Sequence, residues 1–358
     1  MMFRRAYLLQ ILSAFLLVSC APEIATATPA QSLSDPGMTA PTPVATQALE
    51  SESVVKTPAS FVPIHLMGPA EIVPAPGSFT DDVESSGTSS EKRAPYGDSL
   101  KLNRFERPFL ADMTYIPDVD IHKFGLSEDA DWFYISIQLI GSDPNNSTGI
   151  NYGVEIDQNA DGYGDYIIWA NPPYSSAWDT GIVQVFIDTN QDSGGLSVTQ
   201  SEDVFEGDGY DTLIFDGGAG GNDDPDLAWV RLNGGEKATI QFAFKKSFAP
   251  DSFMYGVVAD AALKDVSKFD YSDRFTNAEA GSPIRGKENY PLGLLFAVDN
   301  TCWDAYGFEE SGYEPKICQE FQPVIEPLNT EQPSSCSPPP NCDGNGGGAY
   351  DPVTCGCL

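Results

Sequence analysis

Acidic and amide side chains alternate along a short loop between two apolar segments. Residues 153–170 read GVEIDQNADGYGDYIIWA, and Gly162 allows a sharp turn in the middle of the loop. Calcium takes about six to eight oxygen ligands, which a compact loop with acids at alternate positions can supply. The spacing therefore predicts a calcium site. Its ligands would be Asp157, Asn159, Asp161, the backbone carbonyl of Tyr163, and Asp165.

This spacing resembles the calcium loops of EF-hands, dockerins and thrombospondin type 3 repeats. The resemblance implies a structural calcium loop, with one departure. Ile168 stands at position twelve, where an EF-hand carries a bidentate glutamate, and the flanking residues have the pattern of strands. A further ligand must then come from elsewhere or from water. The alternative is a hairpin in which Asp161 and Gly162 serve only the turn geometry.

Two more acidic loops follow. Asp188, Asn190 and Asp192 repeat the alternate spacing and form a second candidate metal site, although the next glycine comes one place late. The stretch 216–226 is rich in glycine and acids. Its Asp223, Asp224 and Asp226 could donate ligands to another site or lie in a solvated loop.

The charge balance favours bound cations. The chain has 19 Lys and Arg against 52 Asp and Glu, which gives a net charge of −33 and excludes nucleic acid as a partner. Between Lys123 and Arg231 there is no Lys or Arg, whereas Asp and Glu occur 20 times. Divalent cations would offset this imbalance. Adaptation to high salt is the alternative, and it explains the clustering of acids in loops less well.

The first residues have the pattern of an export signal. Arg4 and Arg5 precede an apolar run that ends in Leu17-Val18-Ser19-Cys20, which resembles the lipobox of bacterial lipoproteins. The resemblance implies that residues 1–19 are removed and that Cys20 is acylated, for example with palmitate. We expect a protein of the cell envelope, anchored to a lipid bilayer through Cys20. An ordinary secreted protein with a chance cysteine is the alternative.

The rest of the chain divides by composition into three parts. Residues 20–95, rich in Pro, Ser and Thr, predict a disordered linker. An apolar patch at 61–76 interrupts it and is expected to be semi-ordered; it could form a strand at the edge of the domain, whereas its prolines disfavour a central strand. Residues 96–325 predict the calcium-binding domain. Residues 326–358 predict a small cysteine-rich tail.

The domain reads as an all-β fold. In DWFYISIQLIG, Phe133, Ile135, Ile137 and Leu139 alternate with polar and aromatic residues, as in a strand with one buried face. The other predicted strands are NYGVEI, DYIIWA, GIVQVFID, DTLIFD, LAWVRL, ATIQFAF, FMYGVVA and LGLLFAV. Such short strands favour an antiparallel β-sandwich with long acidic loops. Their order loosely resembles DOMON and carbohydrate-binding modules, which implies a binding module instead of an enzyme.

The cysteines predict disulfides in an oxidising compartment. Cys302 and Cys318 bracket a loop after the last strand and are predicted to pair. Cys355 and Cys357 are too close to pair without strain, so each should pair with Cys336 or Cys342. Two connectivities remain for the tail, and a zinc site is the alternative.

The evidence for an enzyme is weak. There are only two histidines, and no zinc-protease, P-loop or serine-hydrolase motif is present. Three aromatic residues beside the calcium loop, Trp169, Tyr174 and Trp178, could stack on sugar rings, or they could pack in the core. We therefore expect a binding module for a glycan or an envelope protein. A polysaccharide hydrolase with paired carboxylates and a purely structural component are the alternatives.

Overall fold

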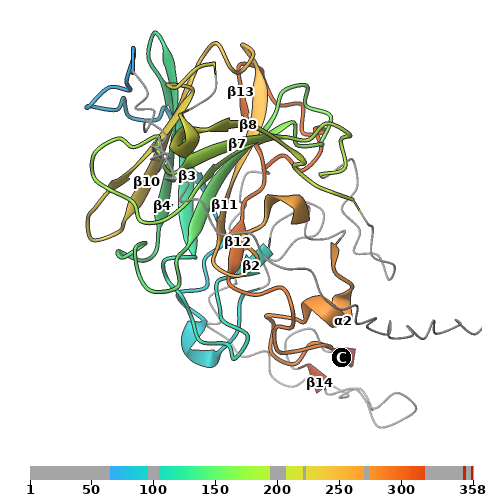
Figure 1. Ribbon diagram of the computed structural model, residues 1–358. Helices are drawn as coiled ribbons and strands as arrows, with labels where there is room; N and C mark the ends of the chain where they lie inside the picture. The colour runs from blue at the N-terminus through green and yellow to red at the C-terminus, as the bar shows by residue number, and fades with distance from the viewer. Residues whose placement is uncertain are drawn as a thin grey trace, which may run out of the picture. The chain divides into compact units, whose positions relative to one another are not determined.

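A computed structural model describes residues 65–95, 105–193, 207–220, 223–269, 274–318, 350–351 and 356–357 (Figure 1). All of these residues belong to one compact unit, Ala59–Leu358. The predicted signal peptide, Cys20, Cys336, Cys342 and Cys355 lie outside the described residues, so lipidation and the tail disulfides stay predictions.

The first sheet has five antiparallel strands in the order β1-β3-β4-β10-β9. Their bounds are β1 Thr80–Asp81, β3 Ile121–Glu128, β4 Trp132–Leu139, β9 Ala228–Asn233 and β10 Thr239–Lys245.

The second sheet has eight strands, in the order β2-β12-β11-β5-β6-β7-β8, with β13 also paired to β11. Their bounds are β2 Phe105–Arg107, β5 Asn151–Asp157, β6 Tyr166–Ala170, β7 Val183–Ile187, β8 Thr212–Asp216, β11 Phe253–Asp260, β12 Val298–Asn300 and β13 Asp304–Tyr306.

The remaining elements are short. They are the 3-10 turns η1 Ser89–Glu91, η3 Gly217–Ala219 and η4 Val266–Lys268, the helix α2 Asn277–Ala280, and a small hairpin of β14 Tyr350–Asp351 and β15 Gly356–Cys357. Within the described residues, no helix has the length and apolarity needed to cross a membrane.

The main core lies between the two sheets, which confirms the predicted antiparallel β-sandwich. The alternation in β4 puts Phe133, Ile135, Ile137 and Leu139 on the inner face. On the opposing sheet they meet residues of β5 and β11, and the ring centroids of Phe133 and Phe253 lie 5.3 Å apart. Burial of apolar side chains from both sheets is the main force that holds the sandwich closed.

The segment 65–95, which we call the strap, lies on the sandwich, and its residues near Ala70 cover part of the outer face of β4. Ala70 and Val73 of the strap pack against the cluster that contains Trp132 and Tyr134. The backbone N–H of Ala70 donates to the Tyr134 hydroxyl at 2.9 Å. Strand β1 adds two residues of the strap to the edge of the first sheet. The structure thus differs from the predicted linker here, because residues 65–95 lie on the sandwich.

The strand predicted for LGLLFAV differs as well, because only Val298 of this stretch belongs to a strand, β12. Ala297 has a positive φ of 50°, which interrupts the extended backbone just before β12 begins. Strand β3 escaped prediction for a related reason. A β-bulge between Ile121 and Lys123 breaks the alternation of apolar residues on which a sequence pattern depends.

The predicted bond between Cys302 and Cys318 is confirmed. It closes a loop with a sequence separation of 16 and lies beside the buried side chains of Trp303 and Ile317. Replacing both cysteines by serine should lower the free energy of unfolding by about 2–4 kcal/mol, since the unfolded chain gains freedom. Urea denaturation would measure the loss, with Ser311→Ala in the same loop as the control. An unchanged midpoint would contradict a stabilising role for the bond.

Candidate metal centre

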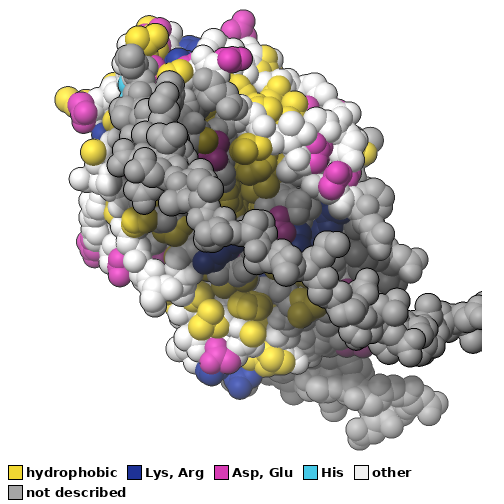
Figure 2. Space-filling view, in the orientation of Figure 1, with side chains coloured by type: hydrophobic (Ala, Val, Ile, Leu, Met, Phe, Trp, Pro, Cys, Tyr) yellow, Lys and Arg dark blue, Asp and Glu magenta, His cyan; other side chains and the backbone are white. Residues whose placement is uncertain are grey.

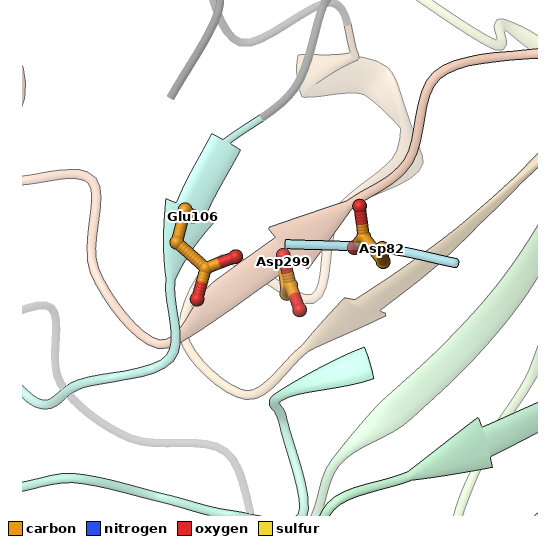
Figure 3. Close-up of side chains that lie close together, drawn as sticks. All are labelled: Asp82, Glu106 and Asp299. Carbon is orange, nitrogen blue, oxygen red and sulfur yellow. The ribbon is translucent and has the colours of Figure 1, made fainter. Parts of the chain in front are cut away.

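Three carboxylates from distant parts of the sequence meet at the edge of the sandwich. Asp82 follows β1 directly, Glu106 lies on β2, and Asp299 lies on β12. Each offers a carboxylate oxygen, and these oxygens all lie within 4.8 Å of one another. Figure 3 shows the three side chains reaching the same place from three separate segments. We call these residues the carboxylate cluster.

Sheet pairing forces two of these acids together. Glu106 and Asp299 are direct cross-strand partners in the β2–β12 ladder. Like charges opposite each other on neighbouring strands destabilise a sheet. Strand β12 is also paired on its other side, to β11, so Asp299 cannot move away without loss of that ladder. The two carboxylates are therefore held at short range by the backbone.

Burial makes the negative charge of Asp299 still less favourable. Its side chain is 0% exposed, and Oδ1 has no hydrogen-bond partner, whereas Oδ2 accepts the backbone N–H of Ile121 at 2.7 Å. Burial raises the pKa of Asp299 well above its ordinary value, and the nearby charges of Glu106 and Asp82 raise it further. A buried carboxylate oxygen without a donor is costly unless a proton or a cation satisfies it.

Asp120, just before β3, is a further acid beside the cluster and is itself buried. The Tyr115 hydroxyl donates to its Oδ2 at 2.5 Å, and the backbone N–H of Ser85 donates to the same oxygen at 3.0 Å. Its Oδ1 is buried without a hydrogen-bond partner. Burial raises the pKa of Asp120 to about 8, and the charges of Asp82 and Glu84 add to the effect.

The donor set decides which ligand the cluster could hold. All three members offer carboxylate oxygens, and no histidine or cysteine takes part. Hard cations such as calcium and magnesium prefer oxygen ligands, whereas zinc and copper favour imidazole and thiolate. Three carboxylates can present up to about six oxygens, which suits the flexible coordination of calcium. The residues therefore fit a hard divalent cation.

Sequence reasoning missed this cluster. Its members lie on short strands or just after one, where no periodic pattern can be recognised, and residues 82 and 299 are far apart in the chain. One signal was present in the sequence. Asp299 directly follows the apolar run 292–298, so an acid stands there where a buried residue is expected, whereas Glu106 lies among charged residues and gave no such signal.

In the predicted calcium loop, residues 157–165, the acidic side chains accept hydrogen bonds from backbone N–H groups of the same loop. Backbone N–H groups of Asn159 and Gly162 donate to the two oxygens of Asp157, at 3.1 and 2.8 Å. Asp161 accepts the N–H of Tyr163 at 3.0 Å, and Asp165 accepts that of Gln158 at 2.7 Å. Burial raises the pKa of Asp157 to about 6, with the charges of the other two acids adding to it.

The carboxylate oxygens of this loop do not approach one another as closely as those of the carboxylate cluster. Among the described residues, the carboxylate cluster is the one group of three or more acids, histidines or cysteines whose ligand atoms lie within 4.8 Å of one another. That comparison covers only acids, histidines and cysteines, so it does not include the amide of Asn159 or the carbonyl of Tyr163. The predicted ligand set as a whole therefore stays a prediction.

The second acidic loop packs against the first. Gly164 donates its N–H to the carbonyl of Ser193 at 2.8 Å, and Asp188 donates to that of Asp165 at 3.0 Å. Asp188 accepts backbone N–H groups of its own loop, including that of Ser193 at 2.7 Å. The Asn190 amide donates to Asp192 at 3.2 Å. The two loops therefore form one acidic surface, and its metal binding stays a prediction.

Basic residues from later in the chain supply part of the positive charge that the acidic stretch lacks. Arg274 lies 3.2 Å from Asp192, and Lys245 lies 2.6 Å from Asp224. Asp226, in the third loop, accepts His65 of the strap at 2.8 Å. On the face shown in Figure 2, acidic side chains are distributed singly or in small groups among uncharged ones. Some of the acids are thus paired with basic side chains of the chain itself.

The three aromatic residues beside the first loop are packed against protein. Trp169 is 3% exposed and stacks edge-on against Phe269, and Tyr174 is 4% exposed with its hydroxyl donating to Ile150. Trp178 is half-buried under Arg231, 4.4 Å from the guanidinium carbon to the ring centroid. The packing alternative therefore describes these rings better than stacking on sugars.

A hollow of about 400 Å³ lies next to Trp169 on the outer face of the second sheet. Its lining combines aromatic residues with polar and acidic side chains, among them Phe186, Tyr210, Gln184, Lys264, Asp208, Asp211 and Asp265. Donors, acceptors and apolar surface are thus present together, the mixture found in sites for small polar ligands.

No protein-family profile, no curated protein and no solved structure matches this chain.

Proposed function

We propose that this chain is an exported, lipid-anchored protein of the cell envelope whose calcium-stabilised β-sandwich serves as a binding module. One observation carries the calcium part. Asp299 is buried, has an oxygen without a donor, and stands directly opposite Glu106, with Asp82 beside both. A hard divalent cation would satisfy that oxygen and remove the repulsion. Calcium at the predicted loop, residues 157–165, belongs to the same proposal.

The binding role is supported by the hollow beside Trp169, whose lining includes the polar side chains of Gln184 and Lys264. A glycan or an envelope protein would be the partner. Use of the carboxylate cluster by a polysaccharide hydrolase fits poorly, because Glu106 and Asp299 are only 2% and 0% exposed and a sugar chain could not reach them. The export signal and the acylated Cys20 remain part of the proposal from the sequence.

Calorimetric titration of chelated protein with calcium tests the proposal and assigns the sites. Wild type should bind calcium. Glu106→Gln, which keeps the size of the side chain, should weaken binding at the carboxylate cluster by at least about tenfold, since a carboxylate ligand is lost. The double variant Asp157→Ala with Asp161→Ala should remove any binding at the loop and leave the cluster intact.

Asp143→Asn, outside both groups, is the control and should titrate like wild type. Absence of calcium binding to the wild-type protein would overturn the proposal. Binding that survives Glu106→Gln unchanged but disappears in the loop variant would move the site from the cluster to the loop.

A further inference from the structure

The three members of the carboxylate cluster differ in how firmly the fold holds them. Glu106 and Asp299 stand on adjacent strands of the second sheet, and β12 is paired on both sides. Asp82 belongs to the strap, just after a strand of two residues at the edge of the other sheet. Its N–H donates to the His122 carbonyl at 3.0 Å as the last bond of that pairing. A ladder this short has little stability of its own.

The next contacts of the strap go to acids at the same place. Ser85 is 0% exposed, and its hydroxyl donates to Oε1 of Glu106 at 2.6 Å. Its backbone N–H donates to Oδ2 of Asp120 at 3.0 Å. Residues 80–86 are therefore held by a two-residue ladder, by side chains of the carboxylate cluster and its neighbour, and by two partly exposed contacts. In those contacts the Thr80 hydroxyl donates to Asp304 at 2.8 Å, and Glu84 lies 3.1 Å from the His122 ring.

We infer that cation binding at the carboxylate cluster and docking of residues 80–86 of the strap are a single coupled event. The inference rests on the proposed calcium site. Without a cation, the repulsion among Asp82, Glu106 and Asp299 is lowered by protonation or by movement of the member that lies outside the strands. That member is Asp82, and its departure takes Ser85 with it. With calcium bound, Asp82 becomes a ligand and the segment closes over the site.

Linkage makes this coupling reciprocal. A ligand shifts a conformational equilibrium only as far as its affinities for the two states differ. The docked state supplies three carboxylates and the undocked state two, so calcium must favour docking. The strap precedes the sandwich in the chain and follows the predicted tether from Cys20. Calcium would thus control how firmly the sandwich is attached to its own tether segment.

Hydrogen exchange of the full-length chain, in calcium and in chelator, tests the coupling. Amides of residues 80–86 should exchange at least about tenfold faster in chelator, because this segment opens locally. The start of the strap offers an internal control. Leu66 and Met67 donate their N–H groups to buried Asp226 at 2.8 and 2.9 Å, away from the cluster, and should not respond to calcium. Strand β4 should also exchange equally in both conditions and so report that the sandwich stays folded.

Two variants that each remove one negative charge from the strap distinguish the loss of a cluster ligand from a general effect of charge. Asp82→Asn should abolish the calcium response of residues 80–86. Asp81→Asn makes the same chemical change one residue earlier, on an exposed side chain, and should keep the response. Calcium binding without any change in exchange of residues 80–86 would overturn the coupling and leave the proposed calcium site standing. Absence of calcium binding in the wild type would overturn both.

Discussion

Replacing Asp299 by asparagine should stabilise the metal-free protein and abolish its stabilisation by calcium. Asparagine has the same shape and keeps an oxygen for the N–H of Ile121, which now donates to Oδ2 at 2.7 Å. It removes the charge opposite Glu106 from a side chain that is 0% exposed. Removing this buried, unsatisfied carboxylate should raise the free energy of unfolding of the metal-free protein by about 1–3 kcal/mol.

The pH dependence has a definite sign. Burial raises the folded-state pKa of Asp299 above its usual value of 3.8. In metal-free wild type, stability is therefore lost as pH rises above 3.8, because the folded protein must retain a proton that the unfolded chain releases. The advantage of Asp299→Asn over wild type should grow over the same rise in pH.

In wild type, calcium at about 100 times its dissociation constant should add about 2.7 kcal/mol. For a domain of this size that corresponds to a rise in Tm of about 5–10 °C. Thermal unfolding of wild type, Asp299→Asn and the control Asp81→Asn, each with calcium and with chelator, measures both effects. A variant that is less stable than wild type in chelator, yet still gains stability from calcium, would contradict the role given to Asp299.

Replacing Phe133 by alanine should destabilise the sandwich by about 3–5 kcal/mol, the usual loss for a large buried aromatic residue. Phe133 is 2% exposed, and its ring contacts Phe244 of its own sheet at 5.4 Å between centroids. Phe253 and Tyr306 of the other sheet lie at 5.3 and 5.0 Å. The cavity left by the substitution would therefore lie between the two sheets, at the point where their aromatic rings contact one another.

Urea denaturation followed by tryptophan fluorescence measures this loss. Leu213→Ala is the matched control, since Leu213 is 45% exposed on the edge strand β8 and should change the free energy of unfolding by about 0.5 kcal/mol or less. Equal losses in the two variants would mean that Phe133 does not link the sheets.

The sequence determined the parts of the molecule that follow from local pattern. Alternation in β4 placed Phe133 and Ile135 on the inner face, and β5 to β11 formed where apolar stretches were bounded by turn residues. The pairing of Cys302 with Cys318 also followed from two cysteines that bracket one loop. In each case the information lies within a short stretch of chain, because burial of one strand face imposes a period of two.

The tertiary structure alone decided where the carboxylates meet. Asp82, Glu106 and Asp299 come together because β2 pairs with β12 while the strap crosses beside them, and no local pattern encodes such a meeting. The most suggestive motif in the sequence, residues 157–165, shows acids that accept backbone N–H groups of their own loop. Spacing along a chain measures only local proximity, whereas a buried cation site depends on which distant segments the sheets bring side by side.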